Sequence, residues 1–177
     1  MGRLQDERVE LLRSLRQFAG HRAGTVEGLL KGVELAEAGY KGLVIWSPDD
    51  VFSAGANLES LMPVFMKMGS KGIAPEEKKL QDMMLRLRYA NVPVVSAVRG
   101  LALGGGCELA VHSARRVLHM ESYVGLVEVG VGLIPGAGGL AYLARRAAEQ
   151  VEASKGVSGM VGAELMGLGR SIYSVFD

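Results

Sequence analysis

The sequence predicts an α/β domain with a mostly parallel sheet and flanking helices. Two short apolar segments have the composition of buried strands, Lys41 to Trp46 (KGLVIW) and Val92 to Val98 (VPVVSAV). Helical patterns lie between them, and strands that alternate with helices favour right-handed βαβ crossovers. The chain has 177 residues, of which 49% are hydrophobic and 22% charged, so one domain with a core of its own is expected.

The N-terminal part is predicted to be helical. Residues 4–18 (LQDERVELLRSLRQF) combine charged residues with apolar positions at a spacing that indicates an amphipathic helix. Gly20 and Gly24 end this pattern, and a second helix is expected over residues 25–38, up to Gly39.

The middle of the chain predicts further helices around the second strand. Residues 58–68 have helical spacing, whereas residues 69–75 contain Gly, Ser and Pro and indicate a mobile loop. A helix is expected over residues 76–90, with its apolar positions facing inward and its end at Asn91–Val92–Pro93. A last strand is expected at residues 115–119.

The segment Arg99 to Ala110 (RGLALGGGCELA) predicts a functional turn. Three glycines follow the strand and open a short apolar helix. The first N–H groups of a helix have no intrahelical partner and carry the positive end of the helix dipole. Glycines let a ligand approach the backbone, so the turn suits an anion or a carbonyl oxygen that gains negative charge.

Two glutamates accompany this turn. Glu108 lies in the first turn of the helix, where a carboxylate also has a purely structural explanation. Glu128 lies in an apolar run, where a carboxylate must be paired, exposed or raised in pKa. If both face one cavity, one can deprotonate a water while the other delivers a proton to carbon.

Composition and charge exclude several other functions. The formal net charge of +1 gives no basis for nucleic-acid binding. A single cysteine excludes an internal disulfide, and the few Cys and His residues do not cluster as zinc ligands, so no metal is expected. With no long apolar run and a charged N-terminus, we expect a cytoplasmic protein without a membrane span.

Two further motifs have structural explanations. Residues 136–141 match the dinucleotide pattern G-x-G-x-x-A, but Pro135 precedes them and no acid-terminated strand follows, so a turn that seats the next helix is favoured. Cys107 lies beside the glycine turn, yet it has no recognisable histidine partner and is more consistent with packing than with a nucleophile.

Three motifs together resemble the crotonase, or enoyl-CoA hydratase/isomerase, family: GLALGGGCELA, FSAGANL (Phe52 to Leu58) and VEVGVGLIPGAGG (Val127 to Gly139). The resemblance covers residues 26–145 and implies a crotonase-like fold, a ββα superhelix or ClpP-like spiral. We therefore expect one crotonase-like domain over residues 1–177. Its expected parts are an atypical helical N-terminus (1–24), the family core (25–145) and a short C-terminal segment that need not be well ordered (146–177).

The resemblance also implies roles for individual residues. The backbone N–H groups of Ala56 and Gly105 match the oxyanion hole of the family, and Glu108 and Glu128 match its hydratase pair. Many members have aspartate where this chain has Asn57, which puts the capping of this loop in doubt. The residues expected to contact CoA and substrate are Ala54, Ala56, Asn57, Leu58, Gly104 and Gly105.

The function implied is syn hydration of a trans-2-enoyl-CoA to a 3-hydroxyacyl-CoA in fatty-acid β-oxidation, a lyase reaction. CoA enters as part of the acyl-CoA substrate, and no other cofactor is expected. Homo-oligomers, trimers or dimers of trimers, and a dehydrogenase domain in a longer parent protein are expected by resemblance. Two alternatives stay open: Δ3-Δ2-enoyl-CoA isomerisation, and a shortened non-catalytic relative that binds a thioester or a partner. The shortened, non-catalytic relative is considered because both ends depart from the family pattern and only 38 residues follow Gly139.

Overall fold

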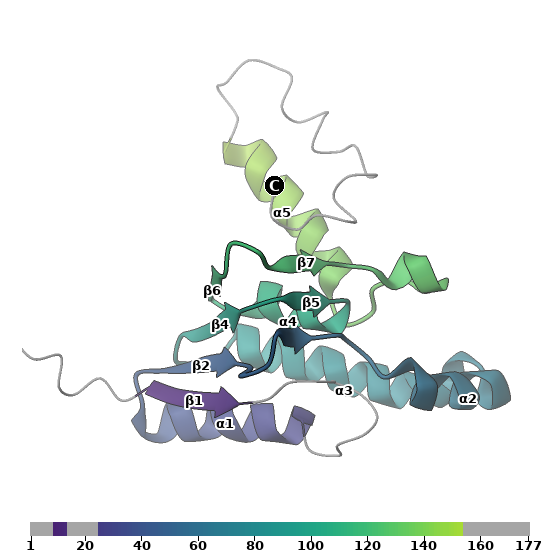
Figure 1. Ribbon diagram of the computed structural model, residues 1–177, viewed down its shortest axis with the longest axis horizontal. Coiled ribbons are helices and arrows are strands. Elements are labelled where there is room, and N and C mark those ends of the chain that lie inside the picture. The colour runs from purple at the N-terminus through teal and green to yellow at the C-terminus, as the bar shows by residue number, and fades with distance from the viewer. Residues whose placement is uncertain (1–8, 14–24, 154–177) are drawn as a thin grey trace, which may run out of the picture.

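The computed structural model describes residues 9–13 and 25–153 (Figure 1). Their strands form two sheets, and every neighbouring pair of strands in each sheet is parallel. The larger sheet has the order β1 (Val9–Arg13), β2 (Gly42–Trp46), β4 (Val94–Val98), β6 (Arg115–Leu118). The smaller sheet has the order β3 (Val51–Ser53), β5 (Leu101–Leu103), β7 (Tyr123–Gly125).

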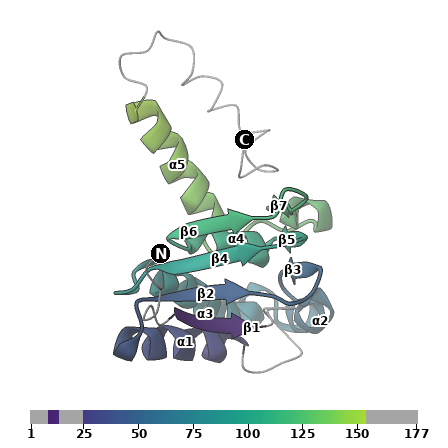
Figure 2. The same cartoon turned by 60° about the vertical axis from the view of Figure 1, so that its left-hand side comes forward.

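The chain repeats a strand–strand–helix unit. Strands β2, β4 and β6 of the larger sheet each lead into a strand of the smaller sheet, which lies beyond their ends, and then into helical structure (Figure 2). The spiral α/β fold predicted from the sequence is therefore confirmed. The helices are α1 (Thr25–Gly39), α2 (Leu58–Met68), α3 (Ser70–Arg88), α4 (Gly105–His112), the 3₁₀ helix η1 (Glu128–Val131) and α5 (Gly139–Ala153).

The core lies between the larger sheet and helices α1, α3 and α4. Helix α3 contributes Met83, Met84 and Leu87, which face inward as its spacing predicts. These side chains meet apolar residues of the sheet and of α1 that are at most 3% exposed. Those partners are Leu29, Val33, Ala36, Leu43, Ile45, Val94 and Val98. In the described part of the chain, no helix has the length and apolar character needed to cross a membrane.

The prediction of a helix over residues 4–18 is wrong for Val9–Arg13. These residues form strand β1, which pairs in parallel with β2 from Val9↔Gly42 to Arg13↔Trp46. Tertiary pairing overrides local propensity here, because the edge of β2 offers backbone hydrogen bonds that an isolated helical pattern does not reveal. The other residues of 1–24, and residues 154–177, lie outside the described part of the chain.

The predicted loop at residues 69–75 is also wrong, because α3 starts at Ser70. Only Gly69, with φ 63° and ψ −156°, separates α2 from α3, and its N–H donates to the carbonyl of Phe65 at 2.7 Å. Gly72 serves packing: a Cβ at this position would stand 2.7 Å from the Cβ of Met68 on α2. The small residue permits a close approach of two helices and does not mark a loop.

Candidate active site

Gly104 forms the turn between β5 and α4. Its φ of 53° and ψ of −120° lie in a region that residues with a Cβ avoid. Its N–H donates to the carbonyl of Gly125 on β7 at 2.9 Å, and its carbonyl accepts from the N–H of Glu108 at 3.0 Å. Helix α4 therefore starts at Gly105 with its first N–H groups at the end of the smaller sheet.

The loop after β3 lies against this helix start. A Cβ on Gly55, which has φ 85°, would stand 2.8 Å from the carbonyl oxygen of Leu103 and 3.3 Å from the amide nitrogen of Gly105. The N–H of Gly55 donates to Oγ of Ser53 at 3.2 Å, which fixes the bend. The structure thus brings the backbone next to Ala56 beside the backbone of Gly105. These two segments are the ones predicted to supply the N–H donors of the oxyanion hole.

Asn57 caps helix α2. Its Oδ1 accepts from the N–H of Glu59 at 3.0 Å, and the residue is only 6% exposed. Asparagine therefore performs the N-terminal capping that was in doubt where relatives of this pattern have aspartate. Of the other residues expected to contact CoA in this loop, Ala54 is exposed, while Ala56 and Leu58 are half-buried.

Glu108 is buried and accepts a hydrogen bond from the backbone at the start of α5. Its side chain is 2% exposed, and its Oε1 accepts from the backbone N–H of Gly139 at 2.8 Å. Burial raises the pKa of Glu108 to about 7, the hydrogen bond from Gly139 opposes this rise, and the charge of Glu128 adds to it. Glu108 is therefore able to hold or release a proton near neutral pH.

Glu128 reaches the same turn from η1. A Cβ on Gly104 would stand 3.1 Å from Oε1 of Glu128, so this carboxylate lies directly against the glycine. Its Oε2 is buried and is the one such side-chain oxygen without a hydrogen-bond partner among the described residues. Burial also raises the pKa of Glu128. An unpartnered buried carboxylate oxygen is costly, and a water or substrate group would satisfy it.

Residues that the sequence did not single out complete this site. Gly139, the first residue of α5, supplies the donor to Glu108. Glu77 and Gln81 reach across from α3 to the segment that precedes α5. The PGAGG motif drew attention to this segment as the seat of the next helix, which the structure confirms. The charged surface pattern of α3 gave no signal, because only the tertiary fold brings residues 77 and 81 to residue 136.

The structure also decides between the alternatives for two motifs. Cys107 is fully buried, and burial and the neighbouring Glu108 and Glu128 raise the pKa of its thiol, which disfavours a thiolate nucleophile. Residues 136–141 follow η1 and not a strand, so they lack the setting of a dinucleotide site. Within the part of the chain that the structure describes, no group of three or more His, Cys, Asp or Glu could hold a metal ion.

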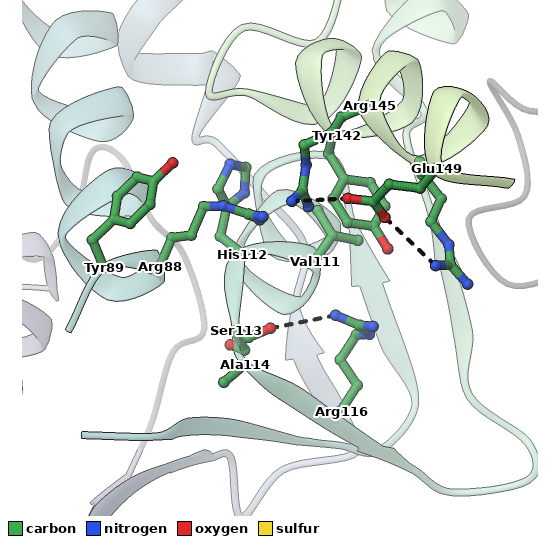
Figure 3. A pocket seen from close by; sticks show the side chains of 11 residues that line it. Arg88, Tyr89, Val111, His112, Ser113, Ala114, Arg116, Tyr142, Arg145 and Glu149 are labelled. Atoms are coloured by element: carbon green, nitrogen blue, oxygen red, sulfur yellow. Dashed lines mark hydrogen bonds and ion pairs between the residues drawn. The ribbon is translucent and has the colours of Figure 1, made fainter. Parts of the chain in front are cut away.

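A separate cavity of about 290 Å³ lies at the other end of α4 (Figure 3). Its four arginines have partners: Arg145 and Arg146 pair with Glu149 at 3.2 and 3.7 Å, Arg116 donates to the carbonyl of Ser113 at 3.3 Å, and Arg88 lies over the ring of Tyr89 at 5.9 Å. Cations near a helix C-terminus are stabilised by the exposed carbonyls and the dipole. Nδ1 of His112, in the wall of this cavity, lies 2.7 Å from the backbone oxygen of Glu108.

Comparisons with known proteins agree with this geometry. A family model described as enoyl-CoA hydratase/isomerase matches residues 22–158. The chain is 40% identical over 114 residues to a probable 3-hydroxyacyl-CoA dehydrogenase of Bacillus subtilis (strain 168). This match covers 64% of this chain and 14% of the relative. It is 37% identical over 123 residues to the peroxisomal bifunctional enzyme of Cavia porcellus. This match covers 68% of this chain and 16% of the relative.

Solved structures show the same fold. An enoyl-CoA hydratase from Polaromonas sp. JS666 superposes with a TM-score of 0.64 at 27% identity, over 68% of this chain and 47% of the other. One from Bacillus anthracis gives a TM-score of 0.62 at 25% identity, over 72% and 48%. The chain therefore spans about half the length of these structures, and 14% and 16% of the two curated relatives.

Proposed function

The chain belongs to the enoyl-CoA hydratase/isomerase family, and from this premise we propose that it binds an acyl-CoA thioester and hydrates a trans-2-enoyl-CoA. The observation that carries the proposal is the pair formed by Glu108 and Glu128 at the glycine turn. Glu108 is buried, Glu128 is half-buried with its Oε2 shielded from water, both have raised pKa values, and Glu128 lies against Gly104. Two neighbouring carboxyl groups with raised pKa values suit the addition of water, which needs one base and one acid.

The thioester oxygen is proposed to lie between the backbone N–H groups of Ala56 and Gly105. The enolate that forms during hydration places negative charge on this oxygen, and donors fixed by the backbone need no rearrangement to stabilise it. Loss of one such donor typically costs about 3 kcal/mol of transition-state stabilisation. The close approach of Gly55 to the Gly105 backbone supports this placement, because it brings the two segments side by side.

The two glutamates divide the proton transfers. Glu108 takes a proton from the water whose oxygen bonds to C3 of the enoyl chain, while Glu128 delivers its proton to C2 from the same face. The electrons of the C2–C3 double bond pass through the enolate and form the new C2–H bond. The pKa of Glu108, raised to about 7, supports a base that is partly ionised at neutral pH.

Isomerisation of a 3-enoyl-CoA to a 2-enoyl-CoA is the second candidate. It needs the same oxyanion donors and one acid that moves a proton between C2 and C4. The unequal setting of the two glutamates favours it: Glu108 is held by Gly139, whereas Oε2 of Glu128 has no partner among the described residues and is available to one shuttled proton.

We also propose that the product passes to a dehydrogenase. Hydration yields a 3-hydroxyacyl-CoA, and the Bacillus subtilis relative is named a probable 3-hydroxyacyl-CoA dehydrogenase. That relative is much longer than the region matched here, so a hydratase region and a dehydrogenase region in one parent chain would fit both observations.

A coupled assay separates these candidates. The chain is supplied with crotonyl-CoA, NAD⁺ and a separate 3-hydroxyacyl-CoA dehydrogenase, and the formation of NADH is followed. NADH from the 2-enoyl substrate establishes the hydratase. Conversion of a 3-enoyl-CoA to a 2-enoyl-CoA, without NADH from crotonyl-CoA, establishes the isomerase. Binding of the thioester without either reaction identifies a non-catalytic relative and contradicts the proposal.

A further inference from the structure

We infer that Glu77 on helix α3 is a third carboxylate of this site, a positioning residue that sets the pH range in which Glu108 and Glu128 exchange protons. The inference rests on the proposed function for its catalytic meaning, while the contacts that carry it are independent of any substrate. They run from α3 to the segment between η1 and α5.

Glu77 lies against Gly136. The side chain of Glu77 is half-buried, and a Cβ placed on Gly136 would overlap with its Oε1. The carboxylate thus occupies the space that any side chain at position 136 would need. The absence of a side chain at Gly136 thus leaves room for the carboxylate of Glu77 to lie directly against the PGAGG segment.

Gln81, one helical turn after Glu77 on α3, also contacts Gly136. Its Nε2 donates to the carbonyl oxygen of Gly136 at 2.7 Å. Residues four apart in a helix lie on one face, so Glu77 and Gln81 form two neighbouring contacts with the segment. This segment continues to Gly139, whose N–H holds Oε1 of Glu108 at 2.8 Å. Helix α3 consequently fixes the donor that positions Glu108.

The charge of Glu77 acts on both acids of the pair. Burial is the largest cause of the raised pKa of Glu108 and of Glu128, and the negative charge of Glu77 raises each pKa further. In the site, the charge of Glu77 acts on Glu108 of α4 and on Glu128 of η1. The neighbouring cations on α3 have partners of their own, because Lys78 pairs with Asp82 and Lys79 with Glu27.

This arrangement differs in its consequences from a purely structural contact. If Glu77 only filled space beside Gly136, its removal would displace the segment and lower the catalytic maximum at every pH. If its charge acts on the pair, its removal makes the ionised forms of Glu108 and Glu128 easier to reach. Both limbs of a bell-shaped pH profile then move to lower pH.

The first test is the pH dependence of kcat/KM for Glu77→Gln, which keeps the size of the side chain. We expect both limbs of the profile to move to lower pH relative to the parent chain. Glu76→Gln is the matched control, because Glu76 is the preceding residue on α3, is exposed, and acts on Lys79 instead. Limbs that do not move in Glu77→Gln, or that move equally in Glu76→Gln, overturn the inference.

The second test needs no activity. The side-chain carboxyl carbons of the glutamates, labelled with ¹³C, are titrated by NMR in the parent and in both variants, with Glu108→Gln to assign its signal. The Glu108 carboxyl should titrate at lower pH in Glu77→Gln and at the parental pH in Glu76→Gln. An unchanged Glu108 titration overturns the inference even if hydration is observed. A shifted titration in a chain without hydratase activity upholds the coupling and contradicts the proposed function alone.

Discussion

The backbone N–H of Gly139 donates to Oε1 of Glu108 at 2.8 Å, although 31 residues separate them in the sequence. Gly139 is the first residue of α5, so the carboxylate accepts from a helix N-terminus, where negative charge is stabilised. Burial of Glu108 works in the opposite direction. Burial is the larger effect, and together with the charges of Glu128 and Glu77 it raises the pKa of Glu108 to about 7, close to the pH at which a base must change its protonation state.

The first prediction concerns stability and pH. Glu108 binds its proton more tightly in the folded chain, with a pKa of about 7, than in the unfolded chain, where 4.5 applies. The folded state holds more protons between these values, so the free energy of unfolding falls as pH rises through this range. A difference of this size corresponds to about 3 kcal/mol. Glu108→Gln should remove this part of the decline in the free energy of unfolding. Urea denaturation of the parent and the variant at pH 5 and pH 8 measures it.

Glu128 remains in the Glu108→Gln variant and contributes a decline in the same direction, since its pKa is also raised. The test therefore compares how much the free energy of unfolding changes between pH 5 and pH 8 in the parent and in the variant. A parent and a variant with equal pH dependence between pH 5 and pH 8 would show that Glu108 titrates normally in the folded protein.

The second prediction concerns the glycine turn. Gly104→Ala should lower stability by about 1–3 kcal/mol through backbone strain and should also displace the Glu128 carboxylate, whose Oε1 lies 3.1 Å from the new Cβ. Gly69→Ala is the matched control, because Gly69 also has a positive φ, 63°, but no atom within 4 Å of a Cβ. We expect similar losses of stability, and a loss of kcat in Gly104→Ala alone at temperatures where both variants are folded. Equal kcat in both variants would show that the contact with Glu128 is not needed for turnover.

The third prediction concerns the acid side of the stability profile. Glu37 near the end of α1 accepts from Arg86 at the end of α3 and from the N–H of Asn91 at 2.8 Å. The hydrogen bond from Arg86 is the main cause that lowers the pKa of Glu37 to about 2. This link stabilises the fold at neutral pH, and the stabilisation is lost as pH falls from 4.5 towards 2.

Glu37→Gln should therefore flatten the loss of stability below pH 4.5, as followed by circular dichroism in urea. Glu34→Gln serves as the control on the same helix, because the salt bridge of Glu34 is to exposed Lys31 in a contact of the i,i+3 type, and Glu34 acts on Arg86 through its charge without a hydrogen bond of its own to it. If the two variants lose stability in parallel with the parent as the pH is lowered, the link between α1 and α3 does not depend on the charge of Glu37.

Much of the fold is readable from local pattern. The strands at Lys41–Trp46 and Val92–Val98, the helix at residues 25–38 and the glycine turn appear where composition and spacing predict them, to within a few residues at each end. The two wrong elements have different reasons. At Val9–Arg13, pairing with the distant strand β2 overrides a local pattern of charge. At residues 69–75, Gly72 packs against Val64 and Met68 of the preceding helix, so this glycine serves packing and does not mark a loop.

The candidate site shows the same division. Glu108 and Glu128 could be named because they match the hydratase pair of the family that the three motifs resemble, and because the carboxylate of Glu128 lies in an apolar run. Gly139 and Glu77 could not, since their roles depend on distance: the first donates across the fold to Glu108, and the second reaches residue 136 from another helix. Glu77 lies among other charged residues on α3, and no pattern in the sequence separates it from them.

The central claim is that Glu108 and Glu128 act together in hydration, and it is tested most directly by the loss of enone absorbance of crotonyl-CoA. Glu108→Gln and Glu128→Gln keep the shape of each side chain and remove its proton transfer. We predict that each variant lowers kcat by about 10²–10⁴-fold, while its dissociation constant for a non-reactive CoA thioester stays near the parental value. A near-parental rate in Glu128→Gln would contradict the claim and leave Glu108 as the single acid of the site.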